Sequence, residues 1–117
     1  MMFKSGPPRV FLYTKAVDFR KQLDGLASVA QEICGVDPYC GAAFIFRPKR
    51  NDRIKIILWD GTGMMMIYKR LESGEFRWPR VEDGIMKLSE AQFAALFDGL
   101  EWRHIYSCRT RRPKKAA

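Results

Sequence analysis

Arginine and lysine side chains gather in two parts of this chain, and their chemistry suits the binding of phosphate groups. One group lies between residues 47 and 70, and the other lies in residues 103–117. Cations that neutralise phosphates supply most of the sequence-independent affinity of proteins for nucleic acid. The candidate DNA-binding residues are Arg47, Lys49, Arg50, Arg53, Lys55, Lys69, Arg70, Arg109, Arg111, Arg112, Lys114 and Lys115.

The excess of positive charge is concentrated at the C-terminal end. The chain of 117 residues has a formal net charge of +8, from 21 basic and 13 acidic residues. Residues 103–117 hold six basic residues and no acidic one, so residues 1–102 carry a net charge of only +2. Blocks of like charge usually form solvated interaction tails. We therefore expect one domain over residues 1–102 and a disordered basic tail over residues 103–117, which either binds phosphate or only aids solubility.

Residue patterns for catalysis or metal binding are missing. The single histidine, His104, stands beside the tail, and Cys34, Cys40 and Cys108 have no zinc or redox spacing. No nucleophile elbow, phosphate loop or metal-ligand motif is found. Acidic residues such as Asp60 stand where turns and helix caps are expected. The sequence therefore predicts no enzyme activity, no catalytic residue, no metal and no cofactor.

Signals for export or membrane insertion are also missing from the sequence. The first residues lack the apolar run of a signal peptide. No stretch approaches the roughly 18 apolar residues that a membrane span needs. An odd number of cysteines without a pairing pattern favours reduced thiols. We expect a soluble, cytoplasmic protein without membrane contact.

Hydrophobic periodicity predicts an α+β domain with an antiparallel meander of about four to six strands. Strands are expected at residues 9–13, 43–47, 53–59, 64–71, 75–78 and 85–88.

Two helices are expected to pack with this sheet. The first spans about residues 18–34, with Asp18 as its N-cap. The second spans about residues 89–100, where Ser89 and Gln92 match a capping box.

The central hairpin can be interpreted residue by residue. If Trp59 pairs with Met64, alternation gives the hairpin two different sides. The core-facing side holds Ile54, Ile56, Leu58, Met65, Ile67 and Leu71. The second side holds Trp59, Ile57, Met64 and Met66 at the turn end, and Lys55, Tyr68, Arg53 and Arg70 at the other end.

Two interpretations of the second side remain open. In the first, the basic end binds a phosphate backbone, since Arg53 opposite Arg70 is unfavourable without an anion nearby, and Lys55 makes a cation–π contact with Tyr68. As a separate hypothesis, the apolar end binds a protein partner through Trp59, Met64, Met66 and Tyr68. In the second, a helix covers the apolar end and Asp52 or Glu72 neutralises the arginines.

These residues belong to a longer pattern. The run FIFRPKRNDRIKIILWDGTG, followed by YKRLESGEFRWPR, resembles the small second-reading-frame (Orf2-like) protein of the insertion-sequence-66 family of bacterial transposable elements. The segments DFRKQLDGL and LSEAQFAALFDGLEW are also similar to that family, and the resemblance covers roughly residues 9–103. Two stretches depart from the family pattern, namely residues 14–17 and 64–66.

The resemblance implies a non-catalytic accessory role in transposition, a form of DNA recombination, beside a separately encoded transposase. The expected partners are element-end DNA and the transposase of the same element. We expect DNA binding through the basic loop, the hairpin face and the tail. The alternative is a protein-interaction module that docks on the transposase without direct DNA contact.

Overall fold

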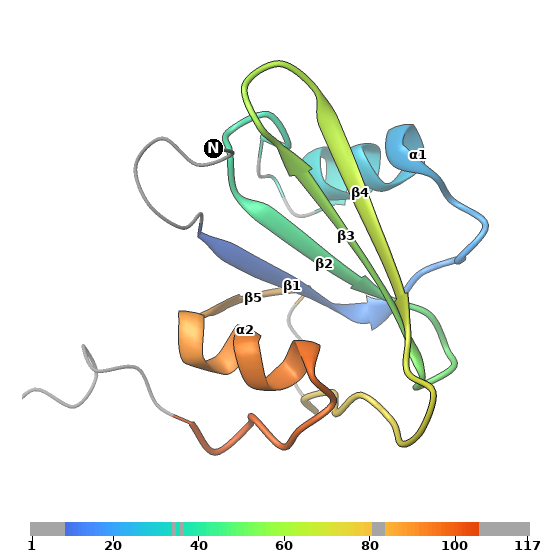
Figure 1. Ribbon diagram of the computed structural model, residues 1–117. Helices are drawn as coiled ribbons and strands as arrows, with labels where there is room; N and C mark the ends of the chain where they lie inside the picture. The colour runs from blue at the N-terminus through green and yellow to red at the C-terminus, as the bar shows by residue number, and fades with distance from the viewer. Residues whose placement is uncertain (1–8, 34, 36, 81–83, 106–117) are drawn as a thin grey trace, which may run out of the picture.

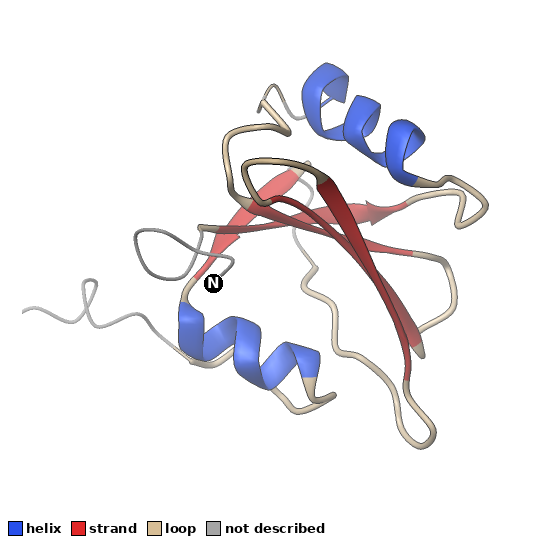
Figure 2. Cartoon of the chain, turned by 45° about the horizontal axis from the view of Figure 1, so that its top comes forward, coloured by secondary structure: helices blue, strands red, loops and turns tan. Residues whose placement is uncertain are grey.

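Five strands rich in β-branched and aromatic residues form one sheet in the order β4-β3-β2-β1-β5 (Figure 1). The computed structural model describes residues 9–33, 35, 37–80 and 84–105. The elements are β1 (Val10–Ala16), α1 (Leu23–Ser28), a π-helical turn η1 (Val29–Ile33), β2 (Ala43–Arg47), β3 (Arg53–Trp59), β4 (Met64–Arg70), β5 (Ile85–Leu88) and α2 (Glu90–Phe97). Figure 2 shows α1 and α2 on opposite faces of the sheet, which confirms the α+β class.

The sheet is mixed, although the sequence predicts an antiparallel meander. Strands β1 and β2 run parallel, with Val10 beside Ala43. Parallel neighbours need a crossover connection, and the segment containing α1 provides it. The other three pairings are antiparallel, and β5 lies against β1 at the outer edge.

The predicted register of the central hairpin is confirmed. Trp59 pairs with Met64, Lys55 with Tyr68, and Arg53 with Arg70. The main-chain N–H of Asp60 donates to the carbonyl of Gly63 at 3.0 Å and closes the turn. Alternation then distributes the hairpin side chains between the two faces of the sheet.

Each face of the sheet has its own apolar core. On the α2 side the core contains Leu12, Ile45, Ile54 and Trp102 with their buried neighbours, and Met65 packs against it. On the α1 side a second core surrounds Phe44, Phe46, Ile57 and Leu26. The core-facing side of the hairpin is therefore as predicted, except that Ile67 is exposed.

Helix α1 begins at Leu23, five residues later than predicted. Asp18 does not cap it, because the Asp18 carboxylate accepts a hydrogen bond from the Arg20 N–H at 3.0 Å and pairs with the Arg20 guanidinium at 2.8 Å. Residues 18–21 thus form a turn, in which the Lys21 N–H donates to the carbonyl of Asp18. The position before the helix is Gln22, whose side chain makes no cap.

Helix α2 begins as predicted and ends earlier. Ser89 and Gln92 form the capping box. The helix ends at Phe97 because Gly99 has a φ of 78°, and its N–H donates to the carbonyl of Leu96 at 2.9 Å. No helix in the described part of the chain is long and apolar enough to cross a membrane.

Residues 75–78 do not form the predicted strand. Their side chains do alternate between exposed and buried, since Phe76 and Trp78 are buried in the core on the α2 side. The segment instead bonds to loops, with the Phe76 N–H donating to the carbonyl of Asn51 at 2.6 Å. Alternating burial alone cannot distinguish such a segment from a strand in a sheet.

Lys55 is buried on the α1 side of β3, with only 5% of its surface exposed. Its ammonium donates to the main-chain carbonyls of Phe19 and Lys21, at 2.8 and 2.9 Å. It also lies 4.7 Å from the centre of the Phe19 ring and 5.9 Å from that of Tyr68, which includes the predicted cation–π pair. Lys55 therefore holds the turn before α1 onto the sheet.

Lys69 has the matching role on the opposite face. Its ammonium donates to the carbonyl of Phe97 at 2.5 Å and lies 4.0 Å from the centre of the Phe97 ring. A cation at this position also interacts favourably with the negative, C-terminal end of the helix dipole. Lys69 therefore anchors the C-terminal end of α2.

We predict that Lys55→Met destabilises the domain. Two carbonyls would lose their buried donor, which costs about 1–3 kcal/mol of unfolding free energy. Urea unfolding of the full chain measures this. The matched control is Lys49→Met, at an exposed loop position, where we expect a change within about 0.5 kcal/mol. Equal stability of both variants would contradict the anchoring role of Lys55.

Candidate nucleic-acid interface

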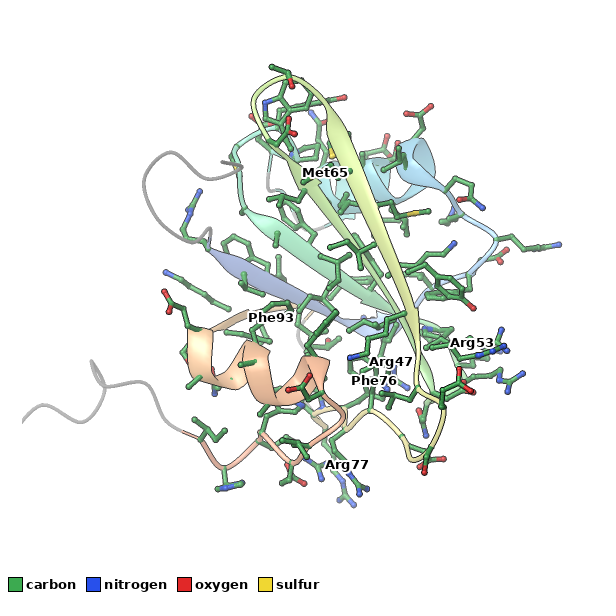
Figure 3. The ribbon with its side chains drawn as sticks, in the orientation of Figure 1. Arg47, Arg53, Met65, Phe76, Arg77 and Phe93 are labelled. Carbon is green, nitrogen blue, oxygen red and sulfur yellow. The ribbon has the colours of Figure 1, made fainter. Side chains whose placement is uncertain are left out.

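Cationic side chains converge at one end of the sheet, which we call the basic end. The ends of β1, β2 and β4 and the start of β3 meet there, because the registers place Ala16 beside Arg47 and Arg53 beside Arg70. Figure 3 shows Arg47, Arg53 and Arg77 at this end. The cations of the basic end are Arg47, Lys49, Arg50, Arg53, Arg70, Arg77 and Arg103.

The predicted like-charge pair of Arg53 and Arg70 is partly neutralised. Asp52 lies 3.6 Å from Arg53 and 3.3 Å from Arg50, and Glu72 lies 3.5 Å from Arg70. The pairs of the exposed Arg50 and Arg70 side chains contribute little, typically under about 1 kcal/mol, so an incoming phosphate can replace them, whereas Arg53 and Asp52 are only partly exposed.

A net positive charge remains on this surface. Lys49 is exposed and has no ion pair within the described residues. Together with Arg50, Arg53 and Arg70 it outnumbers the two carboxylates, which leaves a net charge of +2. These four side chains and Arg47 are the members of the predicted DNA-binding set that the structure places at the basic end.

A groove of about 460 Å³ continues from Arg53 along the α1 side. Asp18, Arg20 and Tyr68 line it with Lys55. Hydrogen bonds from Arg20 hold the pKa of Asp18 well below its usual range. The carboxylate is therefore ionised at neutral pH and disfavours a phosphate in this part of the groove.

Lys55 and Lys69 do not belong with the other cations. Both ammonium groups bind main-chain carbonyls inside the domain. They also lie on opposite faces of the sheet, since alternation places Lys55 toward α1 and Lys69 toward α2. We therefore leave both lysines out of the proposed interface.

Sequence reasoning did not identify Arg77 and Arg103 as site residues. Both line a second groove, on the α2 side, together with Arg47. The signal for Arg77 was its place in the alternation, where it points away from the core between Phe76 and Trp78. Arg103 was counted with the tail.

The apolar end of the hairpin is partly covered. Met64 and Met66 pack against the core under α1, as the second interpretation of this face expected. Trp59 lies edge-on to Tyr39, with ring centres 5.2 Å apart. Tyr68 is the most accessible member of the predicted partner surface, with 50% of its area exposed.

Most of the predicted tail lies outside the described residues, including Arg109, Arg111, Arg112, Lys114 and Lys115. Its first residues pack on the domain. Arg103 donates to the carbonyl of Trp78 at 3.1 Å, and Gln92 donates to the carbonyl of Ile105 at 2.8 Å. The folded domain therefore extends a few residues past position 102.

Acidic and histidine side chains in the described ranges do not form a metal-binding group of three or more. Asp60 has the predicted turn role, since its carboxylate accepts from the N–H groups of Thr62 and Gly63, both at 2.9 Å. His104 is exposed beside Arg103.

Comparison with known proteins gives consistent matches over nearly the whole chain. The profile of the family described as "IS66 Orf2 like protein" matches residues 8–107. The Sinorhizobium fredii protein y4jC is 42% identical over 109 residues, which cover 93% of each chain. A second protein of that organism, y4hO, is 38% identical over 96 residues, or 82% of this chain and 84% of the relative.

No solved structure gives a significant match. The family profile covers both cores and the whole basic end. The chain belongs to the IS66 Orf2-like family, which places it among the accessory proteins of transposition.

Proposed function

We propose that this protein is a non-catalytic accessory factor that binds DNA in the bacterial cytoplasm during transposition of an insertion sequence. Its proposed contact surface is the cluster of exposed Lys49, Arg50 and Arg70 with partly exposed Arg53, assisted by the C-terminal tail. One observation carries the proposal: four cations from a loop and two strands meet at one end of the sheet, where two carboxylates of the described residues, Asp52 and Glu72, lie in ion-pair distance of them.

The positions of the loop and strand ends favour DNA as the partner. The loop of residues 48–52 joins β2 to β3, and the exposed side chains of Lys49 and Arg50 project from it. Arg53 and Arg70 are held by the hairpin register. Cations on rigid elements lose less conformational freedom when they bind a phosphate backbone.

We predict that the double variant Arg50→Ala, Arg53→Ala binds duplex DNA more weakly. The slope of log binding constant against log salt concentration should fall by roughly two units, because two phosphate contacts are lost. Electrophoretic shift with element-end and scrambled duplexes across a salt series measures both quantities.

The control removes equal charge elsewhere. Lys87 is exposed on β5, and Arg9 lies at the opposite end of β1 from the basic end. The double variant Arg9→Ala, Lys87→Ala should keep the salt slope of the unmodified chain. If both double variants lower the salt slope equally, DNA binding depends only on the net charge of the protein, and the proposed surface is wrong.

Deletion of residues 109–117 is a separate test. This segment holds five of the 21 basic residues. We expect its loss to weaken binding to all duplexes alike and to lower the salt slope, with little change in unfolding free energy. If the deleted chain no longer discriminates element-end from scrambled DNA, sequence recognition belongs to the tail instead.

The alternative function is docking on the transposase of the same element without DNA contact. The aromatic side chains of Tyr39, Trp59 and Tyr68 favour it, since Tyr39 and Tyr68 are 55% and 50% exposed and Trp59 is partly exposed. Aromatic side chains at partly exposed positions are frequent anchors of protein interfaces. Absence of a DNA shift, combined with co-purification of the transposase that Tyr39→Ser and Tyr68→Ser abolish, would support docking over DNA binding.

A further inference from the structure

A polar groove on the α2 side of the basic end leads to an inference that rests on the proposed DNA binding and extends it. Its volume is about 270 Å³. Segments far apart in the sequence line it: the end of β2, the β2–β3 loop, residues 75–79 and residue 103. The side chains that matter here are Arg47, Asn51, Glu75, Arg77, Trp78 and Arg103.

Arg47 is a half-buried cation without an anion. Its guanidinium lies 5.2 Å from the ring centre of Trp78, and its Nε donates to the carbonyl of Pro48 at 3.4 Å. Within the described residues no carboxylate lies in ion-pair distance of it. Burial lowers the pKa of the Arg47 guanidinium, yet arginine stays charged in proteins. A buried cation is unfavourable unless an anion or hydrogen-bond acceptors compensate it.

Arg103 lines the same groove as Arg47. Its guanidinium makes two hydrogen bonds to Glu101, at 2.6 and 2.8 Å, and a third to the carbonyl of Trp78 at 3.1 Å. Those contacts use three of its five N–H donors, which leaves two for a ligand. Hydrogen bonds from Arg103 lower the pKa of Glu101 to about 2, so this support persists at neutral pH.

Arg77 and Asn51 complete the donor set. Arg77 is exposed and has no ion pair within the described part of the chain, while its carbonyl accepts from the Trp102 indole at 2.7 Å. Asn51 is fixed through its own carbonyl, which accepts from the Phe76 N–H. Both side chains therefore project from anchored backbone into the same groove.

We propose that this groove binds one phosphate group of a nucleic acid, with Arg47, Arg77 and Arg103 as its cationic ligands. Three guanidinium groups supply paired N–H donors in the planar arrangement that matches phosphate oxygens. The anion compensates Arg47, which has no carboxylate in ion-pair distance among the described residues. Glu75 is the opposing charge in the groove and weakens this binding.

The three tryptophans provide reporters for an NMR titration of the full chain. Trp78 lines the groove, its indole Nε is buried without a hydrogen-bond partner, and Trp102 bonds to Arg77. Trp59 lies at the far end of the hairpin and serves as the internal control. Titration with inorganic phosphate should shift the Trp78 indole signal saturably and leave the Trp59 signal unchanged.

Variants of exposed residues then test the ligands. We expect Arg77→Ala to weaken the apparent affinity about tenfold, as the loss of one charge-assisted hydrogen bond implies. Glu75→Gln should strengthen it. Arg9→Ala removes the same charge at the opposite end of β1 and should change little. Equal effects of Arg77→Ala and Arg9→Ala, or no saturable Trp78 shift, would overturn the proposal.

Two kinds of oligonucleotide identify the source of the phosphate. A single strand with a 5′-phosphate is compared with the same strand carrying a 5′-hydroxyl, and with a duplex lacking terminal phosphates. Preference for the first indicates a terminal phosphate, and equal binding indicates an internal phosphodiester. Phosphate binding without duplex binding would leave the groove standing and refute the proposed DNA function. If duplex binding is weakened by the Arg50 and Arg53 variants but not by Arg77→Ala, the proposed DNA function stands and the phosphate site in the groove is refuted.

Discussion

The register of the β3–β4 hairpin is the constraint on which the rest of the domain depends. Pairing of Trp59 with Met64 places Lys55 toward α1 and Lys69 toward α2. Each ammonium then holds one covering segment by its main-chain carbonyls. A shift of one residue would reverse both faces, so both anchors would be lost together with the two apolar cores.

The same register creates the basic end. It aligns Arg53 with Arg70, and the loop beside them carries Lys49 and Arg50. The parallel pairing of β1 with β2 brings Arg47 to the same end, where residues 75–79 are held by bonds to Asn51 and Trp102. Stability and charge placement thus arise from one set of strand pairings, and the cations divide between the two faces of the sheet.

Local signals explain what could be predicted from the sequence. The bounds of β2 and β3, the hairpin register and the capping box of α2 follow from alternation, turn residues and capping chemistry, all of which act over a few residues. The features that were missed depend on distant contacts. Asp18 fails as a helix cap because Arg20 and the buried ammonium of Lys55 shape the turn around it.

The residues of the candidate site also divide into those that local sequence signals group together and those that only distant contacts bring together. Arg50, Arg53 and Arg70 could be grouped because they lie on the β3–β4 hairpin and on the β2–β3 loop that leads into it. The grouping of Arg47 with Arg77 and Arg103 needs the packing of residues 75–79 across the end of the sheet, which no short-range pattern encodes. Lys55 and Lys69 were also expected at the binding surface, because the carbonyls that bind their ammonium groups belong to other segments of the chain.

The anchors formed by Lys55 and Lys69 have a consequence for how this chain tolerates change. Both lysines bind carbonyl oxygens of the main chain, which every amino acid possesses. The side chain at position 21 is exposed and takes no part in the Lys55 contacts. Substitutions there can alter the charge beside the hairpin while the turn keeps its shape, so the surface of this domain can diversify without cost to its architecture.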